Sequence, residues 1–470
     1  MLFRQKVNSK FRNQSQTYLG ILMLTLLLLV SCKPKVEVHD LEQIQQEGVL
    51  RIITLNTSTS YFIYREDTLG FDYEIAKNFS DSLGVKLEVI VAENEQRMKE
   101  LLLEGKGDLI AFPIKVDIKL KDSLNFCGPQ SITRQVLVQR AGKGDTILHD
   151  QSQLIGKEVY TLRDSKYNER LNNFNEELGG GIHIKYLDRD TLTTEDLIEM
   201  VSTGEIQYTL ADEYVAKLNR TYYNNINITL PMSFDQRVSW AVPKNAPKLT
   251  ETLSNWSERN NKSQNFKAIN KRYFELSKRP LIDAFELPKG LPKGAISPYD
   301  SLFRKHAEGT NYDWAFLAAM SYHESRFINN KKSWAGAAGI MGLMPRTAKS
   351  LGLSEADRMN PDLSIGAAVT LLDRLDVIFK KVEDPQERLK FILAAYNGGD
   401  GHIRDAQNLA AKYGANQFIW NDNVRKFVLL KRNPTYFNDP VCKNGYFRGN
   451  ETVKYVDNVL NTAERFRKGL

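Results

Sequence analysis

The carboxyl group best placed for chemistry belongs to Glu324, near the end of the segment DWAFLAAMSYHES (residues 313–325). Apolar residues lie on almost every side of this segment, which predicts a buried helix. At the C-terminal end of such a helix, burial and the negative end of the helix dipole both oppose ionisation. Glu324 is therefore predicted to keep its proton near neutral pH and to act as a general acid. The structural alternative is a salt-bridged glutamate that ends a helix.

The elements around Glu324 are predicted to be helices alone, from Tyr299 to the end of the chain. Residues 360–379 and 384–399 each open with a capping Asn or Asp followed by Pro, which is typical of a helix start. Between them and Glu324 lies SWAGAAGIMGLMPRTA (residues 333–348), which holds too much glycine for a helix interior. Its backbone is expected to approach a neighbour closely.

A different pattern fills residues 46–277, where short β-branched runs alternate with amphipathic stretches. VLRIIT, GFDYEIAKNFSDSL, VKLEVIV, EQRMKELLLEG and DLIAFPI follow one another as strand, helix, strand, helix and strand, the order of parallel βαβ units. The pattern recurs after residue 156, which predicts two similar lobes. Prolines and glycines then mark residues 278–298 as a linker, because proline disfavours helix at and before its position.

The first 31 residues have the order of an export signal. A basic stretch precedes an apolar run from Leu19 to Val30, which is too short to cross a bilayer. The run ends in Leu-Val-Ser-Cys, and this resembles the bacterial lipobox. The resemblance implies a lipid anchor on Cys32 and a tether over residues 32–45; the alternative is an ordinary signal peptide with a chance cysteine. Lys33 after the cysteine favours the outer membrane, with the protein facing the periplasm.

Composition and charge exclude several classes of protein. With 42% hydrophobic and 26% charged residues over 470 positions, the chain is neither disordered nor collagen-like. Four of the seven net positive charges lie in the first 31 residues, which carry no acid, so charge gives a nucleic-acid partner little support. The spacing of Cys127 and Cys442 asks for no disulfide, and two free thiols are expected. No His or Cys cluster has metal-ligand spacing, so neither a metal nor a cofactor is expected.

The first module resembles the family 3 solute-binding proteins of bacterial transport systems. The matching pieces include GVLRI at 48–52, LGFDYEIAKNFSDSLG at 69–84 and TLADEYVA at 209–216. The resemblance implies a two-lobed α/β receptor in which Asp212 faces the interlobe region and binds an ammonium group. A helix N-cap is the alternative role for Asp212. The ligand-clamping arginine of amino-acid receptors is replaced by lysines in KVDIKLKDSL, which argues against a free α-amino acid ligand.

The second module resembles the lysozyme-like domain of soluble lytic murein transglycosylases. Four motifs carry this resemblance in order: HESRF, GAAGIMGLMPRTA, AAYNGG and ETVKYV. It implies a multidomain protein, with a periplasmic-binding-protein-like module followed by an all-α lysozyme-like domain over residues 299–470. It also implies cleavage of the β-1,4 bond between N-acetylmuramic acid and N-acetylglucosamine without water, which leaves 1,6-anhydromuramyl ends. A lysozyme-like hydrolase and a lipid-anchored peptidoglycan-binding receptor without catalysis are the alternatives.

The same resemblance assigns residues. Glu324 matches the catalytic acid, and the residues that match substrate-binding positions are Ser325, Ser333, Met344, Tyr396, Asn397, Glu451 and Tyr455. Structural roles remain the alternative for Ser325, Met344, Glu451 and Tyr455. Where the family usually has Gln, this chain has Gly342, so one hydrogen bond to the substrate is lost or supplied elsewhere. The implied partners are glycan strands of peptidoglycan, a muropeptide stem in the receptor module and the membrane at the lipid anchor.

Overall fold

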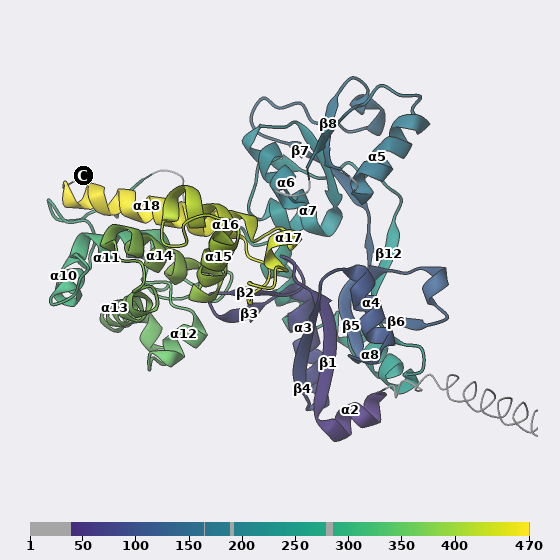
Figure 1. Ribbon diagram of the computed structural model, residues 1–470, viewed down its shortest axis with the longest axis horizontal. Coiled ribbons are helices and arrows are strands. Elements are labelled where there is room, and N and C mark those ends of the chain that lie inside the picture. Colours follow the sequence, from purple (N-terminus) through teal and green to yellow (C-terminus); the bar gives the residue numbers. More distant parts are fainter. Residues whose placement is uncertain (1–38, 164, 189–191, 279–284, 470) are drawn as a thin grey trace, which may run out of the picture.

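The computed structural model describes residues 39–163, 165–188, 192–278 and 285–469. Figure 1 shows a helical body, from α10 to α18, beside a two-lobed α/β body. The expected signal peptide, Cys32, most of the tether and residues 279–284 of the linker lie outside the described residues. Within the part of the chain that is described, no helix is long and apolar enough to cross a membrane.

Lobe 1 is built on a five-stranded sheet in the order β4-β1-β5-β12-β6. β1 is parallel to β4 and β5, whereas β12 is antiparallel to β5 and β6. The strands are β1 (Val49–Leu55), β4 (Lys86–Ala92), β5 (Leu109–Lys115), β6 (Leu124–Thr133) and β12 (Gln236–Pro243). The helices are α2 (Leu41–Glu47), α3 (Phe71–Leu83), α4 (Glu95–Leu103), α8 (Pro247–Asn260) and α9 (Gln264–Phe274). Nonpolar residues of β1, such as Leu50 and Ile52, are fully buried.

Lobe 2 repeats the design with the strand order β11-β7-β10-β8-β9. Its strands are β7 (Gln135–Arg140), β8 (Glu158–Leu162), β9 (His183–Leu187), β10 (Tyr208–Asp212) and β11 (Ile226–Asn227), and its helices are α5 (Lys166–Glu177), α6 (Thr194–Thr203) and α7 (Glu213–Arg220). The chain enters lobe 2 after β6 and returns to lobe 1 through β12, as expected for the two-lobed architecture. Because β8, β9 and β10 are parallel, the helices that follow them all start at the same edge of the sheet.

A short hairpin of lobe 1 was not predicted. β2 (Phe62–Tyr64) pairs with β3 (Asp67–Leu69), and only Arg65 and Glu66 connect them. Both residues have positive φ, 47° and 69°, the backbone of a type I′ turn. Such turns favour Asn-Gly. Because Arg65 and Glu66 do not match that preference, the turn could not be predicted from the residue types. Figure 1 shows the hairpin reaching from lobe 1 toward the helical body.

The helical body is packed around α11 (Trp314–Ser325), whose residues 315–322 are all buried. Asp313 caps this helix by accepting a hydrogen bond from the Phe316 amide at 2.9 Å. The other helices are α10 (Asp300–Ala307), α12 (Pro345–Ser350), α13 (Pro361–Ile378), α14 (Pro385–Gly398), α15 (Asp400–Lys412), α16 (Arg425–Leu430), α17 (Pro434–Phe437) and α18 (Gly449–Arg467). The predicted fold class is confirmed: a two-lobed α/β module is followed by an all-α domain. Cys127 and Cys442 are free thiols.

Candidate active site

Glu324 lies in the last turn of α11, and its side chain is only 7% exposed. The next residue, Ser325, is buried, and its hydroxyl shares one proton between the carbonyls of Ser321, at 3.1 Å, and Ile340, at 2.9 Å. Ser321 donates to the same Ile340 carbonyl at 3.0 Å. Both hydroxyls therefore fasten the end of α11 to the glycine-rich segment, which fixes the position of the Glu324 backbone.

The glycine-rich segment approaches Glu324 as closely as its composition predicts. A Cβ added to Gly342 would lie 2.2 Å from Oε2 of Glu324, and one added to Gly339 would lie 1.8 Å from the Arg358 carbonyl oxygen. Gly342 also has a φ of +62°, a conformation that favours glycine. A glutamine at this position, as the family resemblance suggests, would require the Glu324 side chain or the loop to move.

Two residues of α14 border the same region. Tyr396 is buried and donates its hydroxyl to the Met341 carbonyl at 2.7 Å. Burial, followed by the nearby charge of Glu324, raises the pKa of Tyr396. The side-chain oxygen of Asn397 accepts a hydrogen bond from the Thr452 hydroxyl at 2.7 Å, which joins α14 to α18. Tyr396 is thus a neutral phenol held beside the carboxyl group.

The other predicted site residues approach from α18 and from the glycine-rich segment. Tyr455 is buried, and both burial and the negative charge of Glu324 raise its pKa. Glu451 is partly buried, and burial raises its pKa against the opposing pull of Arg448. Met344 is buried. Ser333 is exposed, and its hydroxyl accepts a hydrogen bond from the Ala337 amide at 3.0 Å.

The partner of Glu324 comes from lobe 1. Nη2 of Arg65 lies 3.1 Å from Oε1 and 3.3 Å from Oε2 of Glu324. The same guanidinium donates to the Gly342 carbonyl at 3.0 Å and to the Asn397 carbonyl at 2.6 Å. The Arg65 side chain is only 9% exposed. Glu324 is therefore held in a buried ion pair with a residue of the other module, a contact that could not be predicted from α11 alone.

Further contacts anchor the hairpin that carries Arg65. Arg346 of α12 donates to the Glu66 carbonyl at 2.8 Å. His402 of α15 lies with Nε2 3.0 Å from the Ile63 carbonyl and Nδ1 3.1 Å from Nζ of Lys431. Since a lysine ammonium can only donate and a carbonyl can only accept, His402 is neutral and carries its proton on Nε2. Burial, reinforced by Lys431, lowers its pKa well below the usual value.

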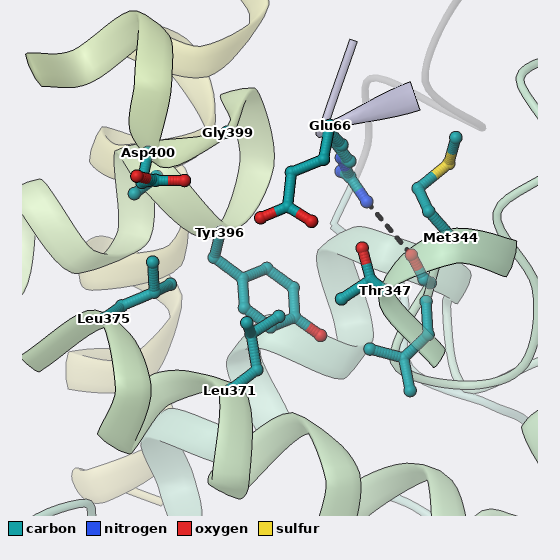
Figure 2. Close-up of a pocket in the computed structure, with 12 residues that line it drawn as sticks. Glu66, Met344, Thr347, Leu371, Leu375, Tyr396, Gly399 and Asp400 are labelled. Atoms are coloured by element: carbon teal, nitrogen blue, oxygen red, sulfur yellow. Dashed lines mark hydrogen bonds between the residues drawn. The ribbon is translucent and has the colours of Figure 1, made fainter. Parts of the chain in front are cut away.

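A cavity of about 30 Å³ remains beside the docked hairpin. Figure 2 shows Glu66 reaching toward it, with Tyr396, Leu371 and Leu375 on the facing side. Gly399, Asp400, Met344 and Thr347 complete the residues labelled there. Arg65 and Glu66 of the hairpin turn line this cavity together with Gly342 and Tyr396 of the helical body.

Asp212, at the end of β10, is the predicted ligand residue of the receptor module. It occupies the N-cap position of α7, but its side chain makes no capping hydrogen bond. Instead, its carboxylate binds the ammonium group of Lys166 at 2.5 Å. An ammonium group from the chain itself thus lies where the resemblance places that of a ligand.

Sequence reasoning missed Arg65, Glu66 and His402 as parts of this site. Arg65 precedes Glu324 by 259 positions and belongs to the other module. Among the described residues, no group of three or more His, Cys, Asp or Glu is placed to hold a metal ion.

Two protein-family models match separate parts of the chain. Residues 301–419 match the model of the transglycosylase SLT domain, and residues 50–276 match that of the bacterial extracellular solute-binding proteins, family 3. Among solved structures, the chain is similar to an ancestral cationic amino acid solute-binding protein, with a TM-score of 0.43 and 19% identity. That match covers 50% of this chain and 99% of the other. A second match is the unliganded L-cystine receptor of Neisseria gonorrhoeae, with a TM-score of 0.42, 18% identity and coverages of 50% and 96%.

Relatives that contain both modules were also found. The membrane-bound lytic murein transglycosylase F of Desulfosudis oleivorans is 32% identical over 90% of this chain and 90% of its own length. A protein with the same name from Pseudomonas fluorescens is 30% identical over 92% of this chain and 87% of its own length. The similarity therefore spans both modules in one continuous arrangement.

Proposed function

The chain belongs to the family of membrane-bound lytic murein transglycosylase F, and on that basis we propose that Glu324 is the acid and base of its reaction. The protein is a peptidoglycan lytic transglycosylase. The observation that supports Glu324 is its position: a single carboxyl group at the end of a buried helix, beside the phenols of Tyr396 and Tyr455.

The reaction needs one proton donor that afterwards becomes a base. Protonated Glu324 gives its proton to the oxygen of the β-1,4 bond, and that bond breaks as the muramyl N-acetyl carbonyl attacks C1 from the opposite side. The resulting carboxylate then takes the proton of the C6 hydroxyl of the same sugar. Attack of that oxygen on C1 closes the 1,6-anhydro ring and restores the N-acetyl group. No water is consumed, and Glu324 ends protonated as it began.

The remaining predicted residues either bind the sugar or fix the end of α11. The glycan is surrounded by Ser333, Met344, Tyr396, Asn397, Glu451 and Tyr455, whereas Ser325 positions Glu324 through the Ile340 carbonyl.

Digestion of purified sacculi tests this proposal. The protein should release muropeptides lighter than the reducing forms by the mass of one water, and Glu324→Gln should release none. Reducing ends would favour the hydrolase alternative, and unchanged function of Glu324→Gln in the cell would favour a receptor without catalysis.

A second role, regulation by the receptor module, is favoured by the Arg65 contact. While Arg65 is paired with Glu324, the carboxyl group is engaged by the receptor module and is only 7% exposed, so a glycan cannot reach it. A peptide stem from the wall, bound between the lobes near Asp212, would shift the hairpin if it prefers a different lobe arrangement. If muropeptide stems change neither the melting temperature nor the turnover of the full chain, this role is wrong.

The relatives' names imply that the protein is associated with a membrane and faces the periplasm. The finer proposal is a lipid anchor on Cys32 in the outer membrane, since acyl chains contribute about 0.8 kcal/mol per buried methylene. Cys32→Ala should move the protein from the outer-membrane fraction to the soluble periplasmic fraction. Cys442→Ala is the matched control and should stay with the membrane. If Cys32→Ala also stays, the anchor proposal fails.

A further inference from the structure

A pocket of lobe 2 holds an arginine of the catalytic domain. Nη1 of Arg448 donates to Glu195 at 3.1 Å and to the side-chain oxygen of Asn219 at 3.1 Å. Nη2 donates to the Tyr223 hydroxyl at 3.1 Å, and the guanidinium carbon lies 3.7 Å from the centre of the Tyr222 ring. The Arg448 side chain is 10% exposed. A carboxylate, an amide oxygen, a phenol and a ring face together form a specific guanidinium site.

Glu195 also links this pocket to lobe 1. Its Oε2 accepts a hydrogen bond from the Tyr446 hydroxyl at 3.0 Å, and its Oε1 accepts one from the Ser58 hydroxyl. Ser58 precedes the first strand of the hairpin by only four residues. One carboxylate therefore joins lobe 2, the base of the hairpin in lobe 1, and the catalytic domain.

The catalytic-domain segment from Gly445 to Arg448 contacts both lobes. The Tyr446 ring lies with its centroid 6.4 Å from that of Phe62 in β2. A Cβ at Gly445 would lie 2.4 Å from Nδ2 of Asn56. Asn56, in the loop before the hairpin, therefore packs directly against the backbone of Gly445. Arg448 immediately precedes α18, the helix that carries Glu451 and Tyr455. The segment thus connects the lobes to one wall of the active site.

Opposite charges extend the contact. Arg432 forms ion pairs with Asp196 and, at 3.3 Å, with Glu199, and Asn450 donates to Glu199. Asp196 and Glu199 lie on α6 with Glu195, so one helix of lobe 2 presents three acids to the two arginines. The free energy of a largely buried ion pair changes strongly with small displacements, because each separated partner becomes a buried charge with no opposite charge beside it.

We propose that the Glu195 junction is the docking site through which the arrangement of the two lobes controls the Arg65 hairpin. Glu195 can hold Ser58 and Arg448 together only while lobe 1, lobe 2 and the catalytic domain keep their present positions. Displacement of lobe 2 relative to lobe 1 separates Glu195 from Ser58 or from Arg448, and the hairpin then loses the support at its base. The turnover measurement below rests on the proposed function, whereas the hydrogen–deuterium exchange measurement does not.

The test uses the full chain with Glu195→Gln, which removes the charge and keeps the size. Glu205→Gln is the matched control, because Glu205 follows α6 in lobe 2 and its carboxylate accepts a hydrogen bond from the Thr203 hydroxyl at 2.8 Å. Hydrogen–deuterium exchange of residues 62–69 should accelerate in Glu195→Gln, on the order of tenfold, as expected for the loss of charge-assisted hydrogen bonds. The control should exchange at the wild-type rate.

Turnover of sacculi provides the second readout. Glu195→Gln should raise anhydromuropeptide release, and it should add nothing in an Arg65→Ala background, where the hairpin no longer pairs with Glu324. Wild-type exchange in residues 62–69, or an increase in turnover that is independent of Arg65, would overturn the proposal. If Glu195→Gln lowers the melting temperature strongly, Tyr223→Phe replaces it, with the same expected direction. If Arg65→Ala releases no anhydro ends, the proposed function is wrong. The Glu195 proposal is then still tested by hydrogen–deuterium exchange, which does not depend on catalysis.

Discussion

At the residue scale, the proposed chemistry depends on which group faces the Glu324 carboxyl. In the present arrangement that group is Arg65, whose guanidinium also binds two main-chain carbonyls of the catalytic domain. A sugar and this guanidinium cannot both occupy the position beside the Glu324 carboxyl group. In the proposed function, Glu324 therefore becomes accessible to the glycan when the hairpin leaves.

Replacing Arg65 with Ala should activate the full chain. The variant loses a buried, charge-assisted contact, and such contacts contribute roughly 1.5–3 kcal/mol each. Release of anhydromuropeptides from sacculi should rise on the order of 10- to 100-fold. Arg51→Ala is a control in the same lobe, since Arg51 pairs with Glu47 far from the site. Equal turnover of wild type and Arg65→Ala would show that the ion pair does not limit activity.

Residue types and spacing were enough to predict Glu324 at the end of a buried helix and the close approach of the glycine-rich segment. They were not enough to predict Arg65. A salt bridge between residues 259 positions apart leaves no local pattern, and the turn that presents Arg65 has neither Asn nor Gly.

At the scale of elements, the β2–β3 hairpin carries the Arg65 contact to Glu324, and α15 contacts the same hairpin. His402 donates to the Ile63 carbonyl, and its ring is stacked 4.3 Å from that of Phe447. This side chain therefore secures a hairpin strand without touching Glu324.

His402→Leu should loosen the hairpin, because the Ile63 carbonyl loses its donor. A lost neutral hydrogen bond costs about 1 kcal/mol, so turnover of the full chain should rise roughly fivefold. His402→Gln is the conservative control: its amide can donate to Ile63 while its oxygen accepts from Lys431. If the Leu and Gln variants have the same turnover, the hydrogen bond does not hold the hairpin in place.

Asp72 in the first turn of α3 predicts a pH dependence of lobe 1. Its oxygens accept hydrogen bonds from Trp240, at 3.0 Å, and Ser60, at 2.8 Å, but burial raises its pKa from 3.8 to about 6. Between these two values the folded protein binds more protons than the unfolded chain, so stability falls as the pH rises. The loss approaches about 3 kcal/mol.

Urea denaturation of the full chain between pH 4 and 7 measures this loss. Asp72→Asn should flatten the dependence, whereas Asp81→Asn, at an exposed position of the same helix, should leave it unchanged. A dependence that survives in Asp72→Asn would assign it to other groups.

The strands and helices of both modules were predictable, because their periodicities and caps are local. α11, α13 and α14 begin within one residue of their predicted starts, and β1, α3, β4, α4 and β5 follow in the predicted order. The β2–β3 hairpin was not, since strands of three residues are too short to show alternation.

At the scale of the whole molecule, the catalytic module contacts both lobes of the receptor module. Lobe 1 contributes Arg65 to the active site, and lobe 2 holds Arg448 through Glu195. The family resemblance of each module predicts its fold, but neither predicts the surface between them. Contacts between modules depend on side chains that the fold of each module leaves free to vary.

The most direct measurement is mass spectrometry of the muropeptides that Arg65→Ala releases from purified sacculi, compared with those from Arg65→Ala combined with Glu324→Gln. Abundant 1,6-anhydro ends are expected from the first protein and none from the second. Reducing ends from Arg65→Ala, or anhydro ends that persist without the Glu324 carboxyl, would show that Glu324 is not the acid of a lytic transglycosylase reaction.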